Sequence, residues 1–340
     1  MTPKVGSRRP PDPHAVIGEL LENNRWLAPM AGIGDPVFRG LCLEQGAGLT
    51  CTEMISAKGL HYGNEATTDL LCLAPGEERC AVQLFGADPE LMAMQAARIE
   101  GAWGERLALI DINMGCPVPK VTRKGEGSAL MRRPELAARI VEEVSDAVSV
   151  PVTIKCRSGW DDGEDSAPVF VQRMERAGAH AACVHGRSAR QGYSGASDRE
   201  VIARCVQAVD IPILASGDLF TYETLGEVLE RTGAAGVAVA RGACGNPWIF
   251  NGYQPTSRDR VEMALRHAMG LCADDEHVGI RRMRKHMAHY LVGFPAAARA
   301  RELAVRCGTL GEFQELCQRI LALLDQREQD KEVGHYAHEG

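Results

Sequence analysis

Short apolar runs recur between residues 26 and 240 at intervals of about 25 to 40 residues. They occupy residues 26–30, 49–53, 80–85, 107–113, 152–156, 181–185, 213–216 and 236–240. Their shortness and their content of Val, Ile, Leu, Ala and Cys are typical of strands that are covered on both faces. Helical patterns separate the runs. Asp35-Pro36, Asp88-Pro89 and Pro134 mark the starts of three of these helices.

Eight strands that alternate with helices within about 220 residues favour a closed parallel barrel. The alternative is a doubly wound open sheet, but no predicted strand is followed by the glycine fingerprint of a dinucleotide fold. We therefore expect an α/β protein with a TIM (β/α)8 barrel at residues 23–252. Residues 1–22, which contain Pro3, Pro10, Pro11 and Pro13, are expected to form a flexible extension.

The pattern changes after about residue 250, where strand-like runs stop. Helical periodicity then covers residues 258–273, 277–292, 296–307 and 310–324. This predicts a C-terminal all-helical domain at residues 253–326, followed by a flexible tail at 327–340.

The net charge of −7 argues against indiscriminate nucleic-acid binding, but it does not exclude a local basic surface. Residues 256–320 contain eleven Lys and Arg against eight Asp and Glu, so the predicted helical domain is basic in an otherwise acidic chain. Four of its cations lie within about two helical turns: Arg281, Arg282, Arg284 and Lys285. We expect them to contact phosphates, and the alternative is an ordinary solvated helix surface.

No uninterrupted apolar run of about 18 residues occurs, and the N-terminus is polar, so we expect a cytoplasmic protein without a membrane partner. The twelve cysteines are scattered without the spacing of a metal knuckle, which predicts reduced core thiols. His185 has no second histidine at metal spacing, and we predict no metal site. The protein is expected to be a monomer.

A thiol follows the fourth predicted strand. The apolar run 107–113 leads into Gly115, Cys116 and Pro117, and the proline must end the strand. Barrel enzymes carry their chemistry at the carboxyl ends of the strands. Cations at 120, 123 and 124 follow the thiol and favour an anionic partner. The alternative is a buried structural cysteine followed by a solvated loop.

Polar or glycine-containing segments lie at or near the carboxyl ends of the predicted strands, where they would line the mouth of the barrel. They are Pro29-Met30-Ala31-Gly32, Glu53, Gln83, Asn113, Lys155, Arg157, His185, Arg187, Ser216-Gly217-Asp218 and Ala240-Arg241-Gly242. The last two segments occupy the usual phosphate station of these barrels, and the alternative is a pair of ordinary turns. Lys155 and Arg157 alternate with Cys156, so both cations point to one side of the strand. They need an anion or an electron-rich ring, or else a carboxylate partner such as Glu53.

These residues resemble the tRNA-dihydrouridine synthases, and within them the bacterial B-type branch. The resemblance covers about residues 25 to 320 and rests on the following segments: 28–32 with Asp35 and Phe38-Arg39, 83–86, 111–117 with Lys120-Val121 and 127–130, 155–159, 184–187, 216–218, 247–250, 284–286 and 293–295. The family commonly has asparagine where Ser216 stands and glycine where Ala240 stands.

The resemblance implies an FMN enzyme that takes electrons from NADPH and reduces the 5,6 double bond of a uridine in tRNA, expected in the D-loop. Hydride would reach C6 from the flavin, and Cys116 would protonate C5. The implied FMN contacts are Pro29, Met30, Ala31, Gln83, Lys155, His185, Ser216, Gly217, Asp218, Ala240 and Arg241. Asn113 and Arg157 would hold the uracil, while Lys120 and the four cations of the helical domain would bind tRNA phosphates.

Two other functions stay open from the sequence. One is a flavin-dependent reductase or dehydrogenase of a free pyrimidine or another small molecule, which would not need the helical domain. The other is a tRNA-binding protein without catalytic activity, which the intact Cys116 and Lys155 argue against.

Overall fold

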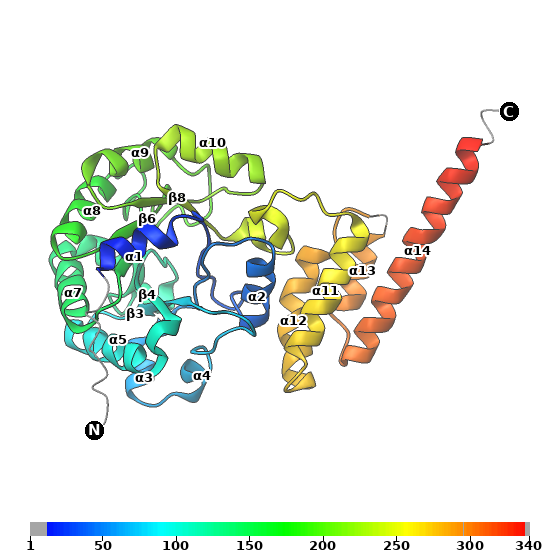
Figure 1. The fold of residues 1–340 in the computed structure, drawn as a ribbon, viewed down its shortest axis with the longest axis horizontal. Coiled ribbons are helices and arrows are strands. Elements are labelled where there is room, and N and C mark those ends of the chain that lie inside the picture. The colour runs from blue at the N-terminus through cyan, green and yellow to red at the C-terminus, as the bar shows by residue number, and fades with distance from the viewer. Residues whose placement is uncertain (1–11, 295, 337–340) are drawn as a thin grey trace, which may run out of the picture.

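The computed structural model describes residues 12–294 and 296–336 and contains a barrel of eight parallel strands (Figure 1). The strands are β1 (Arg25–Leu27), β2 (Ile55–Ser56), β3 (Cys80–Phe85), β4 (Leu107–Met114), β5 (Val152–Arg157), β6 (Ala181–His185), β7 (Ile213–Ser216) and β8 (Gly236–Val239). Neighbours run in the order β1-β8-β7-β6-β5-β4-β3-β2. A parallel bridge between Trp26 and Leu49 closes the ring. The predicted TIM (β/α)8 barrel is confirmed.

The second strand differs from its prediction. The run 49–53 makes only isolated bridges, from Leu49 to Trp26 and from Cys51 to Ala81, and β2 begins at Ile55. A side chain interrupts the ladder here, because the hydroxyl of Thr52 accepts the hydrogen bond from the Gln83 backbone N–H (3.2 Å).

Helices surround the barrel. They are α2 (Pro36–Glu44), α3 (Ala57–His61), α4 (Glu65–Thr68), α5 (Pro89–Trp103), α7 (Pro134–Ala147), α8 (Ala167–Arg176), α9 (Arg199–Ala208) and α10 (Tyr222–Thr232). The predicted caps are present: Asp35 accepts from the Phe38 N–H (2.9 Å) and Asp88 from the Leu91 N–H (3.0 Å). Two short helices, α6 (Pro119–Thr122) and η2 (Gly127–Arg132), lie between β4 and α7.

The N-terminal segment is more ordered than predicted. Residues 13–20 form helix α1 (Pro13–Leu20), so the expectation of a flexible extension is wrong for this part, and residues 1–11 lie outside the described structure. Asp12 caps the helix, and Ile17 is buried in the cluster that contains Trp26 at the barrel interior. The indole N–H of Trp26 also donates to the Leu20 carbonyl (3.1 Å).

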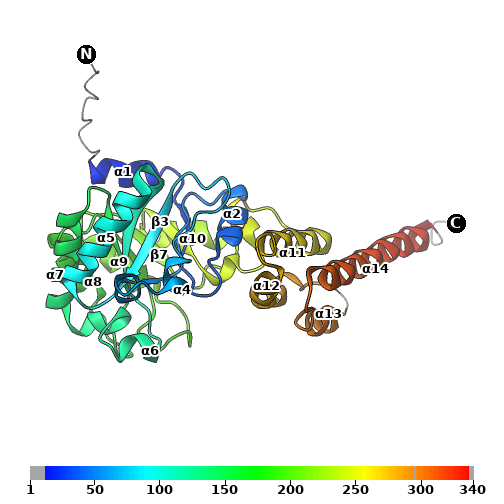
Figure 2. The same cartoon turned by 90° about the horizontal axis from the view of Figure 1, so that it is seen from below.

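Four helices follow the barrel, as predicted: α11 (Ser257–Leu271), α12 (Glu276–Tyr290), α13 (Ala297–Ala304) and α14 (Leu310–Tyr336) (Figures 1 and 2). They have an apolar core of their own, which Leu41 and Trp248 of the barrel complete. Helix α14 runs to Tyr336, so the predicted tail is helical up to that residue, and residues 337–340 are not described. Within the described residues, no helix is both long and apolar enough to cross a membrane.

Candidate active site

A cavity of about 520 Å³ lies at the carboxyl ends of the barrel strands. Its lining includes every residue that the family resemblance implies as an FMN contact, namely Pro29, Met30, Ala31, Gln83, Lys155, His185, Ser216, Gly217, Asp218, Ala240 and Arg241. Cys116, Asn113 and Arg157 line the same cavity. Residues far apart in the chain therefore meet in one place, which the alternation of strands and helices predicted. Their individual roles remain predictions.

The Cys116 thiol is half-buried in the loop that follows β4. The Cys116 backbone N–H donates to Asn113 Oδ1 (3.0 Å), and its carbonyl accepts from the Ser128 N–H (3.0 Å). Gly127 has a φ of 62°, and a Cβ there would lie 2.7 Å from the Cys116 carbonyl oxygen. Only glycine fits this close approach. The Cys116 loop is therefore held by Asn113 at its backbone N–H and by residues 127–128 at its carbonyl.

Lys155 extends from β5 into the cavity and makes no ion pair with any residue that the structure describes. The alternative partner Glu53 instead accepts from the Gly32 backbone N–H and lines a second cavity. A lysine without a carboxylate partner in a cavity is available to an anionic or electron-rich ligand. Cys156 points the other way, into the outer core, as the strand alternation predicted.

Arg157 is buried and links the loop after β4 to the loop after β6. Its Nε donates to the Gly115 carbonyl (2.8 Å), and its Nη1 donates to the carbonyls of Ser188 (2.8 Å) and Gly192 (2.9 Å). Burial lowers the pKa of this guanidinium from its usual range. Nη2 makes no hydrogen bond with the described residues, so it is the part of Arg157 that a ligand can use.

The predicted phosphate station combines a tight turn with charged side chains. Gly217 has a φ of 101°, and a Cβ there would lie 2.5 Å from the His185 ring. Asp218 accepts from Arg187 (2.7 Å) and from Arg241 (3.3 Å). Burial alone would raise the pKa of Asp218, but hydrogen bonds from Ser197 and Arg187 outweigh it and lower the pKa. Asp218 therefore orients the two arginines rather than offering a free carboxylate.

His185 is neutral in this environment. Burial lowers its pKa to about 2, and the cations Lys155, Arg157, Arg187 and Arg241 act in the same direction. Arg187 Nη1 lies 3.3 Å from His185 Nε2, which as a neutral nitrogen can accept that hydrogen bond. The ring is thus a fixed neutral wall of the cavity.

Sequence reasoning missed several side chains of this cavity, among them Tyr193, Phe220 and His289. Tyr193 and Phe220 are 62% and 49% exposed, and both lie against Arg241, whose guanidinium carbon is 4.5 Å and 5.3 Å from their ring centroids. His289 reaches the cavity from α12. Tyr193 lies in the Gly- and Ser-rich loop after β6, a signal that could have identified it. No local signal shows which face of α12 meets the barrel.

The predicted tRNA-binding cations lie outside this cavity. Lys120 is exposed on α6, and Arg281, Arg282, Arg284 and Lys285 are exposed on α12. Arg282 and Lys285 line a second cavity of about 180 Å³ between α12 and the barrel, together with Asp35 and Glu53. Arg284 instead donates to the Cys307 carbonyl (3.2 Å) within the helical domain. We call this cavity between α12 and the barrel the seam. Arg282 and Lys285 line the seam, whereas Arg281 and Arg284 do not.

One cluster of metal-ligating residue types lies in the same seam. The ligand atoms of Asp35, His267 and His286 all lie within 4.8 Å of one another among the described residues. The chain folds these groups together although their spacing gave no sign of it. Ligand atoms of this cluster already take part in hydrogen bonds within the protein. Asp35 accepts from the Phe38 N–H, and Tyr290 Oη lies 3.2 Å from His267 Nδ1.

Comparison with known proteins finds relatives over nearly the whole chain. The family described as Dihydrouridine synthase (Dus) matches residues 26–326. "Probable tRNA-dihydrouridine synthase 1" of Synechocystis sp. is 37% identical over 319 residues, which are 90% of this chain and 89% of that protein. "tRNA-dihydrouridine synthase B" of Pseudomonas putida is 37% identical over 332 residues, 93% of this chain and 96% of that protein. A protein of the latter name from Pasteurella multocida is 37% identical over 287 residues, 80% of this chain and 85% of its own.

Proposed function

The chain belongs to the dihydrouridine synthase family, and from this premise we propose that it reduces the 5,6 double bond of a uridine in the D-loop of tRNA, with FMN as cofactor and NADPH as electron donor. It is a flavin-dependent tRNA-dihydrouridine synthase. The observation that carries the finer proposal is the shared cavity of the Cys116 thiol, Lys155 and Asn113 at the carboxyl end of the barrel.

The residues of the cavity fit FMN. The Gly217 turn leaves no room for a side chain and lies beside Arg241, which suits a phosphate. Lys155 has no carboxylate partner among the described residues and can face the electron-rich pyrimidine edge of a flavin ring. The other proposed contacts are Pro29, Met30, Ala31, Gln83, His185, Ser216, Asp218 and Ala240. When bound, FMN would supply the hydride that adds to uracil C6.

The proposed role of Cys116 is to donate its thiol proton to uracil C5. A thiol that carries its proton and lies beside the reacting carbon can act as a general acid. The thiolate left behind regains its proton from water, so each turnover consumes one hydride and one proton. Asn113 and the free Nη2 of Arg157 border the space for the uracil.

The uridine must leave its stack to enter a cavity at the end of a barrel. Cations around the opening can hold the flanking phosphates, for which we propose Lys120, Arg281, Arg282, Arg284 and Lys285. His289 brings the helical domain into the cavity itself. A reductase of a free pyrimidine would have no use for these cations.

The test is dihydrouridine formation by the purified protein with NADPH and unmodified tRNA, measured by nucleoside mass spectrometry. We expect the isolated protein to carry FMN, and we expect dihydrouridine in tRNA but no turnover of free uracil or uridine. Cys116→Ala should bind FMN and tRNA and lose nearly all product. Cys205→Ala, which removes a buried thiol of α9, should retain turnover. Full activity of Cys116→Ala at saturating tRNA would contradict the proton-donor role.

Lys155→Met separates flavin chemistry from folding. The variant keeps the aliphatic stem and loses the charge. We therefore expect the rate of uracil reduction to fall roughly 100-fold, which is the loss typically seen when an enzyme loses one group that stabilises charge in the transition state. The reduction potential of the bound flavin should fall, because the cation favours the reduced, anionic ring. Lys120→Met, which removes an exposed cation outside the cavity, should leave that potential unchanged.

A further inference from the structure

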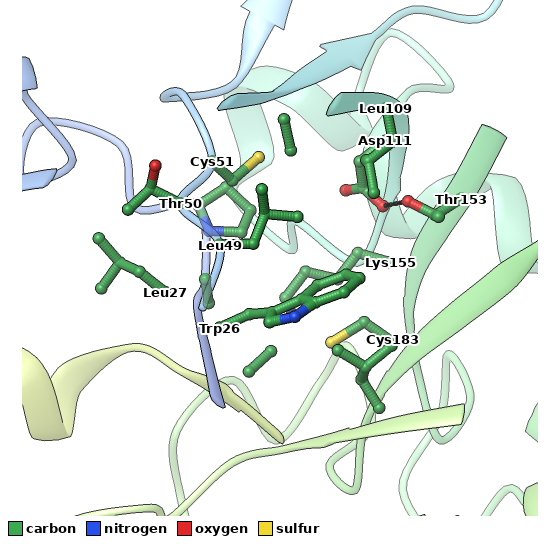
Figure 3. Close-up of a pocket in the computed structure, with 15 residues that line it drawn as sticks. Trp26, Leu27, Leu49, Thr50, Cys51, Leu109, Asp111, Thr153, Lys155 and Cys183 are labelled. Carbon is green, nitrogen blue, oxygen red and sulfur yellow. Dashed lines mark hydrogen bonds between the residues drawn. The ribbon is translucent and has the colours of Figure 1, made fainter. Parts of the chain in front are cut away.

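Asp111 is a carboxylate inside the barrel, on β4 below the cavity that contains Cys116. It is 8% exposed and borders an inner cavity of about 40 Å³ (Figure 3). Burying a carboxylate is unfavourable unless its oxygens are hydrogen-bonded. Its Oδ1 accepts from the Thr153 hydroxyl (2.7 Å), and its Oδ2 accepts from Gln83 Nε2 (2.6 Å). The dihydrouridine reaction described above gives this carboxylate no part.

Two side-chain amides connect Asp111 to the Cys116 loop. Asn113 Nδ2 donates to Gln83 Oε1 (2.8 Å). Asn113 Oδ1 accepts from the backbone N–H groups of Gly115 (3.3 Å) and Cys116 (3.0 Å). The bonds form an unbroken chain from the carboxylate through Gln83 and Asn113 to the backbone of the catalytic loop.

The direction of every bond in this chain is fixed at both ends. A backbone N–H can only donate, so the oxygen of Asn113 must face the loop and its NH2 group must face Gln83. Gln83 must then offer its oxygen to Asn113 and its NH2 group to the next residue. That residue has to be an acceptor, and Asp111 supplies the oxygen. Without an acceptor there, the buried Gln83 NH2 group loses its partner, and only the single bond from Asn113 still holds the Gln83 amide in this orientation.

We propose that Asp111 is a positioning residue, which fixes the orientation of the Gln83 and Asn113 amides and thereby holds the Cys116 loop in its reactive conformation. Its effect on catalysis rests on the proposed function, whereas its effect on the loop does not. Cys116 donates the proton, and Asp111 acts only through the two amides.

The protonation state of Asp111 does not alter this role. Burial raises its pKa, while hydrogen bonds from Gln83 and Thr153 and the charge of Lys155 oppose the rise. A proton on Oδ1 could be donated to the Thr153 hydroxyl, and Oδ2 would still accept from Gln83. The requirement is therefore for an acceptor oxygen and not for a negative charge.

Three variants of the full-length holoenzyme test this requirement. Asp111→Asn removes the charge but can keep an oxygen toward Gln83 with its NH2 group toward Thr153. Asp111→Val removes the acceptor, and the adjoining inner cavity gives the β-branched side chain room. Thr153→Val is the matched control, because it removes the other bond to Asp111 and leaves the chain to Cys116 intact.

The first readout is hydrogen exchange of the peptide that contains Gly115 and Cys116, which does not depend on activity. Exchange should be at least tenfold faster in Asp111→Val and unchanged in Thr153→Val. The second readout is the rate constant of dihydrouridine formation in a single turnover, which should fall at least tenfold in Asp111→Val. The steady-state KM for tRNA should change little. Asp111→Asn should stay within about threefold of the parent in both readouts, because it keeps the acceptor.

Two results would overturn the proposal. The first is an Asp111→Val protein that matches Thr153→Val in both readouts, and the second is an Asp111→Asn protein that falls as low as Asp111→Val, since charge would then be the property that counts. If Asp111→Val does not fold, Asp111→Ala makes the same comparison by enlarging the inner cavity. A parent protein that forms no dihydrouridine would refute the proposed function, while the exchange data would still decide whether the chain orders the loop.

Discussion

His286 Nε2 lies 3.0 Å from Asp35 Oδ2, and this contact joins the helical domain to the barrel. His286 is on α12, whereas Asp35 caps α2 just after the loop that carries Met30 and Ala31 into the active-site cavity. Both side chains are buried. Burial lowers the pKa of His286, so the ring is neutral near pH 7 and donates a hydrogen bond to the carboxylate. The helical domain is thus attached to a cavity loop of the barrel.

His286→Ala should loosen this attachment. The variant removes one donor from a buried carboxylate, which typically costs about 1 to 3 kcal/mol of stability. Urea titration followed by circular dichroism should show the lower free energy of unfolding. His277→Ala is the matched control, because His277 is exposed on the same helix. Equal stability of the two variants would show that the His286 contact contributes nothing.

The two seam-facing cations of α12 should contribute more to tRNA binding than the other two. Arg282 and Lys285 line the cavity between α12 and the barrel, whereas Arg281 and Arg284 do not. We expect Arg282→Gln/Lys285→Gln to weaken tRNA binding and to reduce the slope of log Kobs against log salt by about 0.7 to 0.9 for each phosphate that is no longer neutralised. Arg281→Gln/Arg284→Gln removes the same charge from the same helix and should change the slope less. Filter binding at several salt concentrations provides both slopes, and identical slopes would contradict the division.

The neutral state of His185 predicts how stability depends on pH. Burial lowers its pKa to about 2 in the folded protein, whereas an unfolded histidine titrates near pH 6.5. Between these values the unfolded chain binds one more proton, so stability falls as the pH falls below about 6.5. The contribution reaches about 1.4 kcal/mol per pH unit.

His185→Gln should therefore flatten the acid side of the stability curve. Urea titrations between pH 7 and pH 5, carried out without added FMN, measure the change of slope. Some pH dependence should remain, because burial also lowers the pKa of His286. His277→Gln should keep the parent slope, and a His185→Gln curve parallel to that of the parent would mean that His185 takes up its proton at the same pH in the folded and the unfolded chain.

The strands could be predicted where an apolar run is followed by glycine, which weakens a strand, or by proline, which cannot donate to the ladder. Residues 80–85 and 181–185 form strands with the predicted bounds, and the end of β4 falls just before Gly115 and Pro117. The second strand was misplaced because the Thr52 hydroxyl replaces a backbone acceptor, which an apolar pattern does not reveal. Helix α1 was missed although Asp12-Pro13 repeats the signal that correctly marked α2 and α5.

The cavity residues at strand ends could be predicted, because parallel strands bring their carboxyl ends to one edge. Contacts between the helical domain and the barrel could not be predicted. His289 and Lys285 lie on α12, and the orientation of this helix depends on how the core of the helical domain packs against the barrel. The direction of the hydrogen bonds between side-chain amides could not be predicted from the sequence either. Asp111 was part of a recognised motif, but its link to Cys116 passes through Gln83 on the neighbouring strand.

Gly127 and Gly125 provide a closely matched test of the Cys116 loop. Both glycines have positive φ, 62° and 77°, so alanine is conformationally strained at either position. They differ in their surroundings. A Cβ at Gly127 would lie 2.7 Å from the Cys116 carbonyl oxygen, whereas one at Gly125 would approach only the tip of the Arg133 side chain, at 3.5 Å.

We expect Gly127→Ala to displace the Cys116 loop and to slow dihydrouridine formation by at least tenfold, because small displacements of a reacting group have large effects on rate. Gly125→Ala should lose about 1 kcal/mol of stability through backbone strain alone and keep most of its activity. Single-turnover rates at saturating tRNA, with unfolding free energies measured in parallel, separate the two effects. If both variants lose stability equally and retain equal rates, the contact between Gly127 and Cys116 does not control the position of the thiol.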